Sequence, residues 1–301
     1  MPTSPLLKHS AVLSPKKAAK KSSEIDLSAL RVRDPYIFSD ANTHTYYLFY
    51  NSFHTYCLES KDLLHWDNCR VAFHNDGAFD QNWASEVHAY NGHYYLFSAL
   101  RKDASDQRGC YILKADMPYG PYRPWSERLT PRDKSCIDGT LFVENGTPYM
   151  VYCDEYINYD NEDGRMAIVQ LSADLKRAEG QHKILFHARD NPFSENGVTD
   201  APFLYRATDG SLVMLWSKYK NSRYAIISAV SHSGIFGPWQ QNPEALFDDD
   251  GGHAMVFPKF EGGCGITFHA PNCWSDDGIR GRERVVIRRF VDENGKLSIA
   301  L

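Results

Sequence analysis

The chain of 301 residues is 43% hydrophobic and 24% charged, a composition typical of a globular protein with a large core. Its formal net charge of −5 offers no electrostatic basis for binding nucleic acid or an anionic membrane surface. Residues 1–23 lack the apolar segment of a secretion signal, and no apolar stretch approaches the roughly 18 residues of a membrane span. We therefore expect a cytoplasmic protein with neither a nucleic-acid nor a membrane partner.

Residues 1–28 read as an extended polar leader, and a first strand is predicted from Leu30 to Phe38, so we expect residues 29–301 to form one domain. Five short apolar, aromatic-rich runs follow and are typical of β-strands. Turn sequences such as Asn91-Gly92 precede them, and no stretch has helical periodicity. The runs are Tyr46–Tyr50, Tyr94–Phe97, Tyr149–Tyr152, Leu212–Trp216 and Gly265–Phe268.

The middles of successive runs lie 48, 54, 64 and 53 residues apart, a spacing typical of one four-stranded propeller blade per run. The pattern predicts an all-β fold, a five-bladed β-propeller. A β-sandwich is the alternative, but it gives no reason for a polar residue to precede each run at a similar distance. Those polar residues are Asp34, Glu86, Asp138, Asp200 and His253.

Two ways of closing the ring of blades are open. The segment Arg284–Leu301 contains the apolar triplet Val285–Ile287 and could complete the fifth blade. A strand from the N-terminal region could do so instead.

The first strand of every blade lines the axis of a propeller, so the five polar residues are expected to converge on one small volume. Carboxylates brought together in this way raise one another's pKa, which keeps at least one of them protonated at neutral pH. Glycoside hydrolysis needs this division, because one carboxyl group must donate a proton and another must act as a base or nucleophile. The cluster therefore indicates a catalytic site for a sugar substrate.

Five segments, taken in order, resemble the successive blade motifs of glycoside hydrolase family 43, and the resemblance covers residues 30 to about 275. The segments are Arg33–Pro35, Trp83–Val87, Ile137–Phe142, Val198–Leu204 and Gly252–His253. The resemblance implies a five-bladed propeller that hydrolyses α-L-arabinofuranosyl or β-D-xylosyl linkages of plant-derived oligosaccharides with inversion. It further implies that Asp34 is the general base, that Asp138 orients the acid and modulates its pKa, and that Asp200 is the general acid.

The chain departs from the family at the acid position, where Asp200-Ala201-Pro202 replaces the usual Glu-Gly-Pro. Losing one methylene shortens the reach of the carboxyl by roughly 1.5 Å, and a misplacement of that size can cost about a hundredfold in rate. Glu155 and Glu195 are the alternative acids, and we favour Asp200 because it alone holds the repeat position. A catalytically impaired carbohydrate-binding propeller is the alternative function, and a scaffold for protein partners is a third.

The remaining candidates are substrate-binding residues, namely Trp83, Glu86, Glu155 and His253. Trp83 either stacks on a sugar face or packs in the core. The resemblance implies that His253 holds a water or helps to organise a central cation, so a structural calcium near it is compatible with the sequence. No cofactor is required, because an acid and a base suffice for the reaction.

An intracellular enzyme would meet imported oligosaccharides, so we expect action at chain ends rather than an open groove for internal cleavage. The sequence does not identify the sugar, the linkage or the oligomeric state, because loops form the walls of the pocket.

Overall fold

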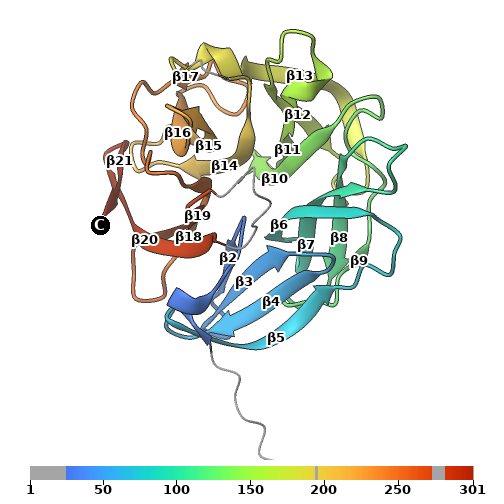
Figure 1. The fold of residues 1–301 in the computed structure, drawn as a ribbon, viewed down its shortest axis with the longest axis vertical. Helices are drawn as coiled ribbons and strands as arrows, with labels where there is room; N and C mark the ends of the chain where they lie inside the picture. The colour runs from blue at the N-terminus through green and yellow to red at the C-terminus, as the bar shows by residue number, and fades with distance from the viewer. Residues whose placement is uncertain (1–24, 194–195, 273–281, 301) are drawn as a thin grey trace, which may run out of the picture.

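The computed structural model describes residues 25–193, 196–272 and 282–300. In this part of the chain, five antiparallel sheets stand around a central axis, and the strands nearest to that axis are β2 (Tyr36–Asp40), β6 (Gln81–Tyr90), β10 (Cys136–Glu144), β14 (Asp200–Arg206) and β18 (Gly252–Pro258) (Figure 1). The fold is therefore the predicted five-bladed β-propeller. None of the three 3₁₀ helices in the described residues has the length and apolar character needed to cross a membrane.

The first blade carries a short additional strand from the N-terminal region. Strand β1 pairs with the outer strand β5 through Ile25–Trp66 and Asp26–His65. The predicted leader ended at residue 28; its residues 1–24 lie outside the described part, and its last residues belong to the blade. The elements of this blade are β1 (Ile25–Asp26), η1 (Leu27–Ala29), β2 (Tyr36–Asp40), β3 (Thr45–Asn51), β4 (Thr55–Ser60) and β5 (His65–Phe73).

The other four blades each have four strands in sequence order. Counted outward from the axis, the predicted apolar runs fall in the second strand of every blade, which is β3 in the first. Blade two has β6 (Gln81–Tyr90), β7 (His93–Arg101), β8 (Gly109–Ala115) and β9 (Arg123–Pro124); blade three has β10 (Cys136–Glu144), β11 (Thr147–Asp154), η2 (Tyr156–Asn158), β12 (Arg165–Leu171) and β13 (Ala178–His187); η3 (Ala188–Asp190) follows; blade four has β14 (Asp200–Arg206), β15 (Leu212–Lys220), β16 (Arg223–Ser231) and β17 (Gln240–Gln241); blade five has β18 (Gly252–Pro258), β19 (Cys264–Ala270), β20 (Arg284–Glu293) and β21 (Lys296–Ala300).

The ring is closed by side-chain contacts between the fifth and first blades. Strands β20 and β21 complete the fifth blade, and among the described residues no N-terminal strand joins it. The hydroxyl of Tyr46 accepts the backbone N–H of Phe260 at 2.8 Å, and the two rings stack with centroids 4.2 Å apart. Ser39 Oγ donates to the carbonyl of Pro258 at 2.7 Å. The C-terminal strands therefore complete the fifth blade, and contacts of Pro258 and Phe260 join that blade to the first.

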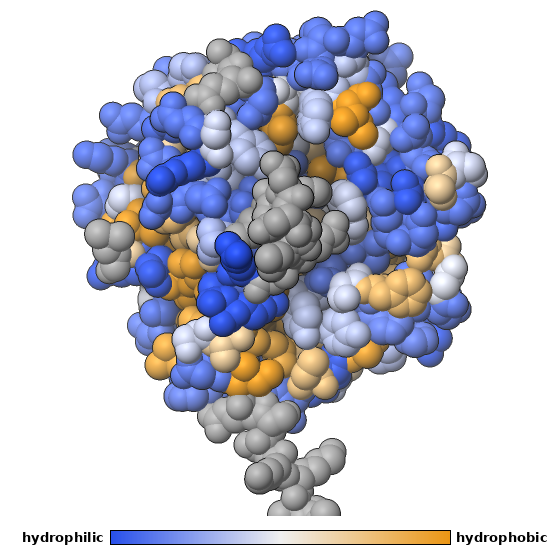
Figure 2. Space-filling view, viewed as in Figure 1, coloured by the Kyte–Doolittle hydropathy of each residue, from blue (hydrophilic) through white to orange (hydrophobic). Residues whose placement is uncertain are grey.

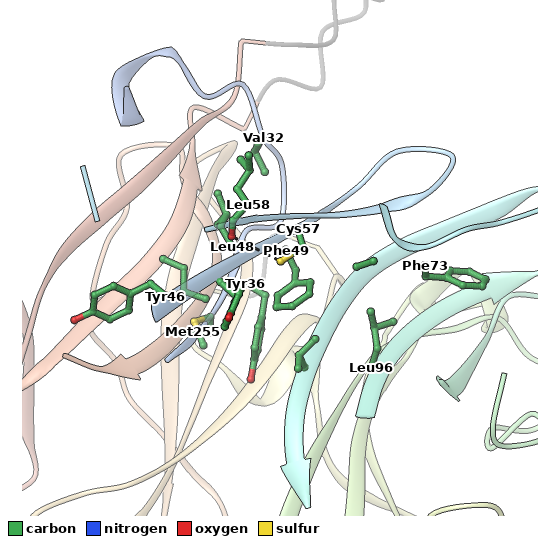
Figure 3. Close-up of a cluster of buried hydrophobic side chains, with 14 of the residues drawn as sticks. Val32, Tyr36, Tyr46, Leu48, Phe49, Cys57, Leu58, Phe73, Leu96 and Met255 are labelled. Atoms are coloured by element: carbon green, nitrogen blue, oxygen red, sulfur yellow. Dashed lines mark hydrogen bonds between the residues drawn. The ribbon is translucent and has the colours of Figure 1, made fainter. Parts of the chain in front are cut away.

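The hydrophobic core lies between neighbouring blades. Figure 3 shows one such cluster, in which side chains of the first blade such as Leu48 and Phe49 pack together with Leu96 of β7 and Met255 of β18. Each large apolar side chain buried in this way contributes about 1.5–3 kcal/mol. This packing holds the inner strands in fixed positions around the axis.

The face seen in Figure 2 is largely hydrophilic. Hydrophobic side chains of its described residues form small separate groups rather than one broad patch (Figure 2). A scaffold for protein partners needs a broad apolar surface, and this face does not supply one.

Candidate active site

The inner strands of blades two to five share a β-bulge close to the axis. The ladder between the first and second strands shifts register at this point in each of these blades. Inside every bulge, one residue other than glycine has a left-handed backbone, with φ between 48° and 58°. Asp34 of the first blade has φ 51° and, like the others, lies two residues before the first regular ladder residue. The structurally equivalent residues are Asp34, Ala84, Asp138, Ala201 and His253.

This set corrects the repeat phase that was read from the sequence. Asp34, Asp138 and His253 are equivalent, as predicted. Glu86, however, lies two residues beyond the equivalent Ala84, and Asp200 lies one residue before the equivalent Ala201. Distances counted along the sequence were misleading because the hairpin turns between the first and second strands differ in length, from two residues after Tyr90 to five after Arg206. Asp200 must therefore be assessed by its contacts and not by its repeat position.

Asp34 lies among cationic and imidazole groups. Its Oδ1 is 3.2 Å from Nδ1 of His253, and its Oδ2 is 3.6 Å from Nε of Arg33. Burial by itself would raise the pKa of Asp34, but the charges of His253 and Arg33 outweigh it and hold the pKa well below its usual range. Its side chain is 19% exposed, so an ionised carboxylate here can reach a water molecule.

His269 supports the backbone of Asp34. The N–H of Asp34 donates to Nδ1 of His269 at 3.3 Å, and Nε2 of the same ring is 3.2 Å from Oδ1 of Asn272. Arg33 also donates to that amide oxygen, at 2.6 Å, which fixes its orientation. The same Nδ1 lies 3.2 Å from Oδ1 of Asp34, so the ring contacts both the main chain and the carboxylate of that residue. Burial lowers the pKa of His269, so the ring is neutral at pH 7.

Asp138 is the most enclosed of the three aspartates. Only 4% of the residue is exposed, and its Oδ2 accepts the backbone N–H of Ala201 at 2.8 Å. Burial, with the negative charge of Asp34 as the second cause, raises the pKa of Asp138 to about 8. Since it also binds the residue next to Asp200, Asp138 can influence both the position and the pKa of that neighbour.

Asp200 is partly exposed and is held by a tyrosine of the same blade. The hydroxyl of Tyr224, in β16, donates to Oδ2 of Asp200 at 2.9 Å. Burial and the charge of Asp138 raise the pKa of Asp200 to about 7, although the hydrogen bond from Tyr224 acts in the opposite direction. A carboxyl with this pKa keeps its proton near neutrality and can release it to a substrate.

The three aspartates therefore divide into one group that is ionised and two that retain protons. Asp34 is negatively charged at neutral pH, whereas Asp138 and Asp200 titrate near or above it as a coupled pair. This separation of pKa values is the arrangement that acid–base catalysis requires.

Glu155 is engaged by an arginine. Arg108 donates to both carboxylate oxygens of Glu155, at 2.8–2.9 Å from Nη2, and the hydroxyl of Ser135 donates to it as well. Both oxygens of Glu155 are therefore already engaged by charged and polar donors, whereas a proton donor needs a carboxyl that can reach the leaving group. The other alternative acid, Glu195, lies outside the described residues.

Trp83 lies beside the same arginine. The guanidinium carbon of Arg108 is 4.1 Å from the centroid of the Trp83 ring, and Trp83 is 37% exposed. Trp83 is therefore not a core residue and presents ring surface to solvent. Arg108 connects it to the Glu155 carboxylate described above.

Glu86 and His253 occupy different surroundings. Glu86 is 5% exposed, and its Oε2 is 3.1 Å from Nε2 of His88. His253 contacts Asp34, and its backbone N–H donates to Oγ of Ser217 at 2.9 Å. The described residues contain no group of three or more His, Cys, Asp or Glu side chains that could hold a metal ion. A structural calcium near His253 stays a prediction from the sequence.

Sequence reasoning did not single out Tyr224 or His269. Tyr224 stands in an apolar strand, and nothing in its local sequence distinguishes it from a core residue. His269 directly follows the fifth apolar run, and the ladder pairs it with Gly252 beside the bulge. A polar residue at the end of a second strand was therefore a signal that could have found it, because Ser217 of β15 is the equivalent residue and also contacts the site.

Comparison with known proteins places these observations in a family. The profile of Glycosyl hydrolases family 43 matches residues 27–296. A crystal structure of an endo-arabinase from Bacteroides thetaiotaomicron is 39% identical, covers 90% of this chain and 98% of that chain, and superposes with a TM-score of 0.81.

More distant relatives agree in fold. An alpha-L-arabinofuranosidase from Lactobacillus brevis is 16% identical, with 89% of this chain and 93% of that chain covered and a TM-score of 0.76. The curated Alpha-L-arabinofuranosidase 43 of Humicola insolens is 28% identical over 94 residues, which span 30% of this chain and only 20% of that protein. The match along almost the whole propeller is decisive: the chain belongs to family 43 of the glycosyl hydrolases, enzymes that hydrolyse O-glycosyl bonds.

Proposed function

We propose that the protein hydrolyses α-L-arabinosyl linkages of plant-derived oligosaccharides with inversion of configuration. The observation that carries the proposal is the pKa division between ionised Asp34 and protonated Asp200 at the propeller axis. The similarity to an endo-arabinase at 39% identity supports arabinose over xylose as the sugar.

In the proposed reaction, Asp34 accepts a proton from a water molecule while the water oxygen attacks the anomeric carbon. The bond between that carbon and the glycosidic oxygen breaks, and Asp200 donates its proton to the departing oxygen. Asp138 remains out of contact with the sugar and keeps the pKa of Asp200 high. In inverting enzymes the two acting carboxyls lie about 6.5–9.5 Å apart, which leaves room for the water.

The position of cleavage has two candidates. Action at chain ends is the prediction made from the sequence, and one solved structure of similar fold, at 18% identity, is described as an exo-1,5-alpha-L-arabinanase. Internal cleavage is favoured by the endo-arabinase at 39% identity. Linear 1,5-α-L-arabinan distinguishes them, because internal cleavage lowers its viscosity long before much reducing sugar has formed.

The test of the proposal combines substrate, stereochemistry and a variant. Purified protein is assayed on aryl α-L-arabinofuranoside, aryl β-D-xyloside and arabinan, and proton NMR follows the anomeric configuration of the first product. We expect turnover of the arabinosyl substrates with inversion. Asp34→Asn should lower kcat by about 10³-fold or more, because an amide cannot accept the proton of water.

A retained configuration would contradict the mechanism. Binding of arabino-oligosaccharides without turnover would instead favour the carbohydrate-binding alternative. The lack of turnover would then be due to the shorter side chain of Asp200, and Asp200→Glu should create activity.

A further inference from the structure

The short acid Asp200 has a buried partner that belongs to none of the family motifs recognised in the sequence. Tyr224 is 1% exposed, and its hydroxyl donates to Oδ2 of Asp200 at 2.9 Å. Because a phenol hydroxyl in this contact is the donor, Oδ2 is occupied as an acceptor. The transferable proton is therefore directed to Oδ1.

The Tyr224 ring has little freedom to move. A Cβ atom added to Gly252 would lie 2.3 Å from Cε1 of the ring, so the backbone of β18 presses directly on Tyr224. On another side the ring stacks on His269, with centroids 5.7 Å apart and an interplanar angle of 19°. The hydroxyl is consequently presented to Asp200 from a fixed position.

The stacked rings connect the acid to the base. Tyr224 binds the carboxyl of Asp200, and His269 accepts the backbone N–H of Asp34. The relative position of the two reacting carboxyls thus depends on contact between two buried rings from β16 and β19. Movement of the acid would reduce catalysis more here than in an enzyme with glutamate, because aspartate has one methylene fewer with which to reach the leaving group.

We propose that Tyr224 is a positioning residue, which orients the Asp200 carboxyl so that Oδ1 carries the proton given to the leaving group, and which acts with His269 to fix the acid relative to Asp34. The inference rests on the proposed function for its kinetic consequences, but the hydrogen bond itself can be tested without turnover.

The kinetic test uses Tyr224→Phe, which keeps the ring and removes only the hydroxyl. Aryl α-L-arabinofuranosides with good and poor leaving groups are compared, because only poor leaving groups need a proton from the acid. We expect kcat to fall at least tenfold for the phenyl glycoside and no more than about twofold for the 2,4-dinitrophenyl glycoside. The alkaline limb of the pH profile should move to higher pH, since the lost hydrogen bond had favoured ionised Asp200.

The matched control is Tyr205→Phe. The hydroxyl of Tyr205 also donates to an aspartate, Asp292, at 3.0 Å, but this pair joins β14 to the outer part of the fifth blade. The Tyr205→Phe variant should therefore have the same kcat on both substrates and the same pH profile as the wild type. Equal losses on both substrates, or no loss in Tyr224→Phe, would overturn the positioning role.

A titration independent of activity separates the inference from the proposed function. Aspartate carboxyl carbons are labelled with ¹³C in the full chain, and Asp200→Asn identifies the signal of Asp200. The pKa of Asp200 should be higher in Tyr224→Phe than in the wild type, and an unchanged pKa would refute the contact. If no arabinosyl substrate is turned over, the proposed function fails while this measurement still decides the inference.

Discussion

The backbone N–H of Asp34 donates to Nδ1 of the buried, neutral His269 across 3.3 Å, so the residue proposed as the base is held through its main chain by a ring from another strand. The same Nδ1 is 3.2 Å from Oδ1 of Asp34, and the Asp34 side chain remains 19% exposed, so a water molecule can still reach its carboxylate.

His269→Phe should therefore impair catalysis through the position of Asp34. The variant keeps an aromatic ring against Tyr224 but leaves a buried N–H without an acceptor, which costs about 1–3 kcal/mol of stability. We expect kcat to fall by about a hundredfold with little change in KM, as measured by steady-state kinetics. His182→Phe is the control, because that ring binds Tyr152 in the third blade at 2.8 Å, and its activity should match the wild type.

The pH profile of kcat/KM should have its acidic limb at a low pH and its alkaline limb near pH 7. The pKa of Asp34 is held below its usual range, so the base stays ionised down to pH values at which ordinary aspartates protonate. The pKa of Asp200 is raised to about 7, so the acid loses its proton, and the rate falls, as the pH rises through 7. An alkaline limb above pH 9 would show that Asp200 is not the proton donor.

Asp138→Asn should stabilise the fold while reducing activity. The folded-state pKa of Asp138 is raised to about 8, whereas an unfolded aspartate has a pKa of about 3.9. The folded protein thus binds more protons between these values, and its stability falls as the pH rises from about 4 to 8. An amide removes this penalty, so the free energy of unfolding from urea titrations should increase by at least about 1 kcal/mol at pH 8 and hardly at all at pH 4.

Asp209→Asn is the control for the stability measurement on Asp138→Asn. Hydrogen bonds from Ser211 lower the pKa of this exposed carboxyl, so its replacement should not stabilise the protein at pH 8. A gain of stability in both variants would mean that net charge, and not burial of Asp138, is the cause.

Arg128→Met should destabilise the second blade strongly. The side chain of Arg128 is 1% exposed, and its guanidinium donates to the carbonyls of Gln107 and Arg108 on one side and of Lys134 on the other. Removing the buried guanidinium takes a donor from several part-buried carbonyls at once, which we expect to cost about 3 kcal/mol or more. Thermal unfolding followed by circular dichroism measures the loss.

An exposed arginine gives the comparison for Arg128. Arg223 has a side chain that is 61% exposed and pairs with Asp249 at 2.8 Å. Arg223→Met should change stability by about 0.5 kcal/mol or less, as expected for a surface ion pair. Similar losses in the two variants would contradict the role assigned to the Arg128 hydrogen bonds.

Much of the architecture could be predicted from the sequence. The apolar runs coincide with the second strands of the blades, because a strand buried on both faces must be apolar along its length. Their spacing identified the propeller, and Asp34 and Asp138 were recognised as equivalent residues. These features are local or periodic, so the order of the residues along the chain is enough to predict them.

The repeat phase of Glu86 and Asp200 could not be predicted in this way. The residues at the equivalent positions are Ala84 and Ala201, and the strand ladder alone reveals this, because the hairpin turns that follow them differ in length. Asp200 faces the site although it is out of phase, because a bulge interrupts the alternation of side chains along the strand.

By itself, then, the sequence determined an all-β propeller of five repeats and the carboxyl groups available to its axis. Only the tertiary structure decided which protonation state each carboxyl takes, because His253, His269 and Tyr224 reach the aspartates from other strands, in addition to Arg33 beside Asp34 in the chain. Burial and charge act through space over a few ångströms, and no separation along the chain predicts them.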